Sequence, residues 1–169
     1  MPGPAAAQAG GRAVAVPDPG VIDTVTPAVV LDSNVVFDWL VFRQPGVQPL
    51  VEAITEGRLR WLVTGPMLEE LRHVLGRGVL ARWQPDAEAL QAACVRWACV
   101  CPVPSPQGAA LRLRCRDTDD QKFIDLALAG PARWLLSRDK AVLALARRAR
   151  PLGLAIMTPE AWAASAGAG

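Results

Sequence analysis

The sequence holds a single histidine, His73, among its 169 residues. A Ser-His-Asp triad needs a histidine as its general base, so this scarcity argues against hydrolysis of that type. No two of the four cysteines stand in a C-x-x-C pair, and His73 is remote from them in sequence. A zinc site is therefore not expected. We expect instead reduced and mostly buried thiols, at Cys94, Cys99, Cys101 and Cys115.

Long apolar runs are also lacking. No stretch approaches the ~18 residues of a membrane span, so no membrane partner is expected. Residues 1–26 are rich in Ala, Gly and Pro, without a basic start followed by an apolar block. This composition does not indicate a signal peptide; it predicts a disordered tail in a cytoplasmic protein. Residues 27–165 are expected to form one folded domain. The sequence has no G-x-S-x-G, Walker or G-x-G-x-x-G motif.

Lysine is nearly absent. Of the 18 basic residues, 16 are Arg, and only Lys122 and Lys140 are Lys. The net charge of +2 does not by itself indicate a nucleic-acid-binding protein. Arg contacts phosphate bidentately, which fits such a substrate, but a compositional bias toward Arg and Ala explains the excess better. Three arginines alternate with other residues and are candidates for a phosphate-binding face, although a solvated edge explains them equally well: Arg112, Arg114 and Arg116.

The residues that are present indicate a soluble globular domain, since 51% are apolar and 20% charged. The apolar patterns predict strands at 27–31, 59–63, 100–104, 133–137 and 154–158. Helices are predicted at 35–42, 47–57, 65–78, 86–100, 119–130, 139–149 and 159–165. This alternation predicts an α/β fold, a single domain with a central parallel sheet and helices on both faces.

Acidic residues occupy informative positions in this pattern. Asp32 and Asp139 each follow a predicted strand, and sites in parallel sheets form at such carboxyl ends. Capping the next helix is the structural alternative for each of them. On the helix over 119–130, Asp120 lies within the apolar stripe and Asp119 lies off it. On the helix over 65–78, Glu70 borders the stripe, whereas Glu69 and His73 point away.

Four inward carboxylates require compensation, because buried charge is costly unless it is paired. The nearest cations in sequence, Arg138 and Lys140, are too few. A shared divalent cation solves the problem, and all-oxygen ligands favour Mg²⁺ or Mn²⁺. Such a cation can activate water for phosphodiester hydrolysis without a histidine.

Four motifs in order carry a family resemblance: VVLDSNVV, LEEL, RDTDDQKFIDLAL and LLSRDKAVL. From about Pro27 to Trp162 the chain resembles PIN-domain ribonucleases, and most closely their toxin branch in toxin–antitoxin systems. The resemblance implies a PIN-like domain that cleaves RNA with Mg²⁺ or Mn²⁺. It implies that the metal and catalytic residues are Asp32, Glu70, Asp120 and Asp139. It also implies supporting roles for Asn34, Ser137 and Asp117.

The expected partners are an RNA substrate, a cognate antitoxin protein and a second copy of the chain. Two other functions remain open at this point. A phosphatase-type α/β hydrolase would use Asp32 as its nucleophile, but that class has an acid two residues later, where this chain has Asn34. A catalytically silent PIN-like module would serve only to bind another protein, yet all four acids are present.

Overall fold

The computed structural model describes residues 26–166; apart from Thr26, the expected tail over 1–26 lies outside them. The centre of the domain is a five-stranded sheet in the order β3-β2-β1-β4-β5, and every neighbouring pair is parallel. The strands are β1 (Ala28–Leu31), β2 (Arg60–Thr64), β3 (Ala98–Cys101), β4 (Ala132–Leu136) and β5 (Ala155–Met157). The predicted α/β class and parallel sheet are confirmed.

Each strand supplies side chains to both faces of the sheet. All four residues of β1 are buried. Because successive side chains of a strand point to opposite faces, Val29 and Leu31 enter one apolar cluster while Ala28 and Val30 enter another. Burial on both faces is the physical reason that β1 is a short continuous apolar run rather than an alternating one.

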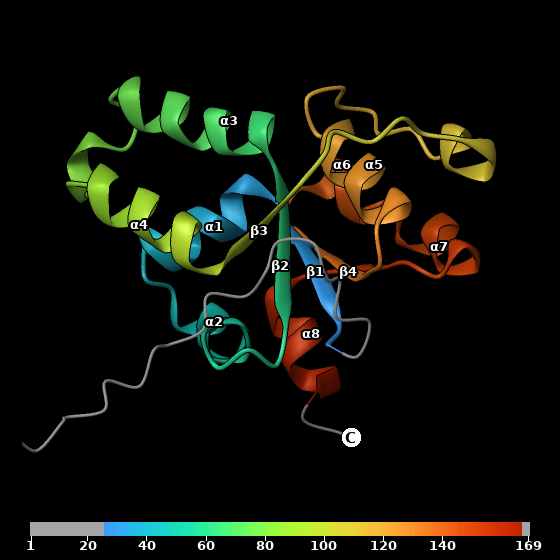
Figure 1. The fold of residues 1–169 in the computed structure, drawn as a ribbon, viewed down its shortest axis with the longest axis horizontal. Coiled ribbons are helices and arrows are strands. Elements are labelled where there is room, and N and C mark those ends of the chain that lie inside the picture. The colour runs from blue at the N-terminus through green and yellow to red at the C-terminus, as the bar shows by residue number, and fades with distance from the viewer. Residues whose placement is uncertain (1–25, 167–169) are drawn as a thin grey trace, which may run out of the picture.

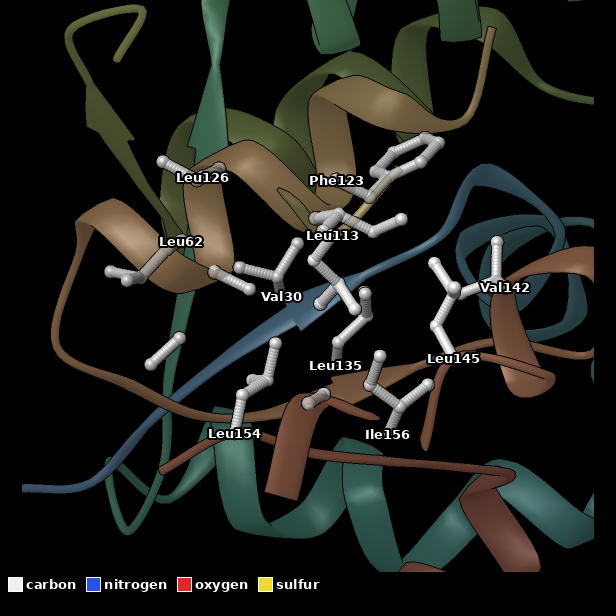
Figure 2. Packing of buried hydrophobic residues seen from close by; sticks show 14 of the residues in the cluster. Val30, Leu62, Leu113, Phe123, Leu126, Leu135, Val142, Leu145, Leu154 and Ile156 are labelled. Carbon is white, nitrogen blue, oxygen red and sulfur yellow. The ribbon is translucent and has the colours of Figure 1, made fainter. Parts of the chain in front are cut away.

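Helices cover both faces of the sheet (Figure 1). One face carries α5 (Gln121–Ala129), α6 (Lys140–Leu143) and α7 (Ala146–Ala149), and Figure 2 shows Phe123 and Leu126 of α5 packed near Val30 and Leu62. The other face carries α1 (Ser33–Leu40), α2 (Gln48–Thr55), α3 (Gly65–Gly76), α4 (Ala87–Trp97) and α8 (Pro159–Ala166). Short 3₁₀ turns are η1 (Pro45–Val47), η2 (Ala81–Trp83), η3 (Gly108–Arg112) and η4 (Arg150–Leu152).

The helix predicted over 86–100 was too long. It ends at Trp97, and Ala98–Cys101 form β3. Four consecutive residues of β3 pair with β2, from Trp61 opposite Ala98 to Thr64 opposite Cys101. The strand predicted over 100–104 therefore begins two residues earlier and ends three residues earlier, and it stops before Pro102, which lacks a backbone N–H for a sheet hydrogen bond.

Two further differences from expectation concern helices near the acidic residues. The helix predicted over 139–149 is divided into α6 and α7 by Ala144 and Leu145. The helix predicted from 119 starts at Gln121, with Asp120 at its N-cap. The carboxylate of Asp117 accepts a hydrogen bond of 2.9 Å from the Asp119 N–H, a local turn that delays the helix. Within residues 26–166 no helix has the length and apolar character needed to cross a membrane.

Candidate functional site

Asp32 lies where the strand order reverses. In the strand order, β2 lies next to β1 on one side and β4 lies next to β1 on the other side. The carboxyl ends of β1 and β4 therefore flank a topological switch point. Asp32 directly follows β1, and its N–H donates to the Leu136 carbonyl at the end of β4 (3.0 Å). Asp32 is only 4% exposed. The sheet thus holds one carboxylate in the position where α/β proteins build their sites.

Two hydrogen bonds hold the carboxylate of Asp32. The Ser137 hydroxyl donates to Oδ2 at 2.5 Å, and the Asn34 N–H lies 3.5 Å from Oδ1. Burial nevertheless raises the pKa of Asp32, against these two hydrogen bonds, and the negative charges of Asp139 and Glu70 raise it further. A nearby cation would stabilise the charged form of this carboxylate.

Asp139 follows β4 after a short turn and caps α6. Its Oδ1 accepts from the N–H groups of Ala141 (2.7 Å) and Val142 (3.3 Å). Its own N–H donates to the Ser137 hydroxyl at 2.9 Å, so Ser137 links Asp32 and Asp139. Both acids cap helices, as the structural alternative proposed, and both also contribute charge to the same place.

Glu70 projects from α3 and is half-buried. Its Oε1 accepts a hydrogen bond of 2.9 Å from the Ser33 hydroxyl at the start of α1. Its Oε2 forms an ion pair with Lys122 of α5. Glu69 and His73 on the same helix are exposed, as the helical periodicity predicted.

Asp120 precedes α5 instead of lying within it, which corrects the position expected from the sequence. Its side chain is half-buried and that of Asp119 is exposed, so the predicted contrast in direction holds. The pKa of Asp120 is raised to about 6, first by burial and then by the negative charges of Asp32, Asp139 and Asp117, against a lowering effect of Lys122. Asp117 itself is exposed.

The four acids therefore come from four separate elements to one region. The charges of Glu70 and Asp139 raise the pKa of Asp32, and those of Asp32 and Asp139 raise the pKa of Asp120. In residues 26–166, however, no three His, Cys, Asp or Glu side chains are arranged so that they could already hold a metal ion. Hydrogen bonds from Ser137, Ser33 and the start of α6 occupy carboxylate oxygens instead. The candidate metal ligands are all carboxylate oxygens, so their chemistry fits Mg²⁺ or Mn²⁺ rather than zinc.

Arg138 was expected to be a cation near these acids, and the structure uses it elsewhere. It pairs with buried Asp38 of α1 and forms a two-pronged contact with Glu160 of α8, at 2.6 and 3.0 Å. The hydrogen bonds to Glu160 and Asp38 raise its pKa, so it stays charged. The backbone N–H of Arg138 lies 3.4 Å from Oδ1 of Asn34, so the side chain of Asn34 lies beside the turn after β4. The sequence alone indicated neither the role of Asp38 nor the pairing of Lys122.

The three candidate phosphate-binding arginines do not form one strand face. Arg114 and Arg116 are exposed and alternate with the buried Leu113 and Cys115, which directs both arginines outward. Arg112 belongs to η3, where its carbonyl accepts a hydrogen bond of 2.7 Å from Arg148.

Comparison with known proteins adds one finding. Residues 28–141 match the family model of the PIN domain. The matched range includes Asp32, Glu70, Asp120 and Asp139, and it ends before β5 and α8. No curated protein and no solved structure matches the chain.

Proposed function

Because the chain belongs to the PIN-domain family, whose members are generally metal-dependent nucleases, we propose that it is an endoribonuclease that requires Mg²⁺ or Mn²⁺. The observation that carries this proposal is the gathering of four acids from the ends of β1 and β4, from α3 and from the start of α5. Their mutual repulsion favours a divalent cation among them, because charge in a half-buried site needs an opposite charge.

In this proposal Asp32, Glu70, Asp120 and Asp139 hold the cation. A bound divalent cation would supply an activated water and neutralise the charge that develops on the phosphate oxygens. Ser137 supports the site by fixing one oxygen of Asp32 and receiving the N–H of Asp139. Asn34 supports it at the turn after β4, and Asp117 adds negative charge beside Asp120.

The surroundings of Asp32 favour this role over that of a phosphatase nucleophile. A nucleophilic carboxylate must reach the phosphorus atom of its substrate. Asp32 is 4% exposed, and Ser137 and Asn34 contact its two oxygens. A buried, restrained carboxylate is better suited to hold a cation than to attack a substrate.

The substrate in this proposal is RNA. Arg114 and Arg116 lie in the segment just before Asp117 and are exposed to solvent. Neither forms an ion pair with an acidic residue in the described part of the chain. They are suited to contact phosphates on either side of the cleaved bond, with Arg112 contributing from η3. Neutralising phosphates in this way predicts RNA binding that weakens as salt increases.

A toxin role is the finer part of the proposal, and it rests on the motif resemblance. In a cytoplasmic toxin, expression of the chain alone should slow growth, and a small protein encoded nearby should bind it and block cleavage. Size measurements of the purified chain would test for a second copy. Harmless expression without an inhibitor nearby would leave a nuclease with no toxin role.

The direct test is RNA cleavage by the purified chain with Mg²⁺ or Mn²⁺, with EDTA as the control. Hydrolysis by an activated water should leave 5′-phosphate and 3′-hydroxyl ends, and EDTA should abolish it. Undiminished cleavage in EDTA, or 2′,3′-cyclic phosphate ends, would contradict the proposal. RNA or protein binding without cleavage would favour the silent module, and turnover of a phosphate monoester would favour the phosphatase.

A further inference from the structure

Lys122 makes the only ion pair to the four acids within residues 26–166. Its ammonium group reaches from α5 to Oε2 of Glu70 on α3, and it also donates a hydrogen bond of 2.6 Å to the Asp119 carbonyl. The two charged side chains are 28% and 32% exposed. This ion pair is therefore at the border of the acid cluster, where solvent still reaches it.

The other cations close in sequence do not share this position. Arg138 forms ion pairs with Asp38 and Glu160 instead. Lys140, the only other lysine of the chain, is exposed and forms no ion pair in the described residues, although it directly follows Asp139. Lys122 alone places a positive charge against an oxygen of a candidate ligand.

Both oxygens of Glu70 are thus occupied by the chain itself. Oε1 accepts from Ser33, a neutral donor, and Oε2 faces the ammonium group of Lys122. A divalent cation and the Lys122 ammonium group cannot both contact Oε2, because like charges repel. A lysine ammonium lies on a flexible four-carbon stem, so it can leave without movement of the helix.

From these contacts we propose that Lys122 is a positioning residue that takes the place of the divalent cation at Glu70. In the metal-free protein its ammonium group holds Glu70 toward the cluster and offsets part of the repulsion among the acids. A cation that binds Oε2 displaces the ammonium group from Glu70, so Lys122 lowers the affinity of the site for the cation. This inference rests on the proposed metal-dependent function and adds a competitor within the chain.

The presence of only two lysines makes a direct test practical. The full chain is labelled with lysine carrying ¹³C at Cε, which gives two side-chain signals that Lys122→Arg and Lys140→Arg assign. Addition of Mg²⁺ should shift the Lys122 signal along a saturable curve and leave the Lys140 signal unchanged. A Lys122 signal that stays in place while Mg²⁺ saturates the protein would overturn the inference and leave the proposed nuclease function intact.

Calorimetric titration of Mn²⁺ supplies a second measurement. Lys122→Met keeps the apolar stem and removes the charge, and it should bind Mn²⁺ about twofold to fivefold more tightly than the wild type, as expected for loss of a partly exposed competing ion pair. Lys140→Met removes the same charge one residue from Asp139 and should change the affinity by less than about twofold.

The outcomes of the titration separate the two proposals. Equal tightening in both lysine variants would mean that net charge alone sets the affinity, and weaker binding in Lys122→Met would mean that Lys122 supports the metal-bound form; either result overturns the inference. Absence of Mn²⁺ and Mg²⁺ binding in the wild type would overturn the metal-dependent function as well. The circular dichroism spectrum of each variant verifies its fold.

Discussion

The hydroxyl of Ser137 donates a hydrogen bond of 2.5 Å to the carboxylate of Asp32, a residue 105 positions earlier, and both side chains are buried. This contact joins the ends of β1 and β4, the two strands that flank the switch point of the sheet. The same hydroxyl accepts the N–H of Asp139. One small polar side chain thus connects two candidate metal ligands to the centre of the fold.

Replacement of Ser137 by Ala should destabilise the metal-free protein. It leaves a buried carboxylate oxygen without its donor, which typically costs about 1–3 kcal/mol. Urea denaturation measures the change in the free energy of unfolding. The control is Ser165→Ala, at an exposed residue whose hydroxyl donates only to the Trp162 carbonyl within α8; it should stay within about 0.5 kcal/mol. Equal losses in the two variants would contradict the importance of the contact.

Two adjacent pairs of acids test the positions of the proposed ligands. Glu70→Gln and Asp120→Asn should each lower the cleavage rate by at least ~10²–10³, the scale for loss of one group that stabilises a transition state. Glu69→Gln and Asp119→Asn should retain most of the activity, because these neighbours have the same charge and are exposed.

Single-turnover kinetics on the four purified variants measures this difference, with circular dichroism to verify folding. If Glu69→Gln proves as inactive as Glu70→Gln, negative charge on α3 matters more than the position of one carboxylate. The assignment of Glu70 as a ligand would then be wrong.

The raised pKa of Asp120 predicts an unusual pH dependence of stability in the metal-free protein. Its value of about 6 lies above the ordinary 3.8, so between these values the folded state binds more protons than the unfolded state. The contribution of Asp120 to stability is therefore present below about pH 4 and is lost as the pH rises through about 6.

Asp120→Asn removes this titration and should raise the melting temperature in EDTA at pH 7 relative to the wild type. At pH 4 the two proteins should differ much less. Thermal melts at both pH values measure the effect, and Asp119→Asn serves as the exposed control. A melting temperature of Asp120→Asn at pH 7 equal to or below that of the wild type would show that Asp120 is not strained by its neighbours.

The Arg138 ion pairs should contribute more to stability than an exposed pair. Arg138→Gln leaves Asp38, whose side chain is only 12% exposed, without its cation, and should cost about 1–3 kcal/mol. Arg58→Gln breaks a pair in which both side chains are 59% exposed and should cost less than about 1 kcal/mol. Denaturation in urea compares the two, and a smaller loss for Arg138→Gln would contradict the structural role of this residue.

Local sequence determined much of the framework. The continuous apolar runs predicted four of the five strands to within about one residue, since burial on both faces demands such runs. It also placed Asp32 and Asp139 after strands, because both positions depend only on where a strand ends. The contrasts between Glu70 and Glu69, and between Asp120 and Asp119, followed from helical periodicity and agree with the observed exposure.

Only the tertiary structure decided how charges are paired. Lys122 and Glu70 lie on different helices, and Arg138 joins α1 to α8, so neither pairing leaves a local pattern in the sequence. The boundary between α4 and β3 was likewise set by pairing with β2, which overrode the helical pattern through Val100. Strand ends and helix faces depend on neighbouring residues, whereas ion pairs and strand register depend on segments that meet only when the chain has folded.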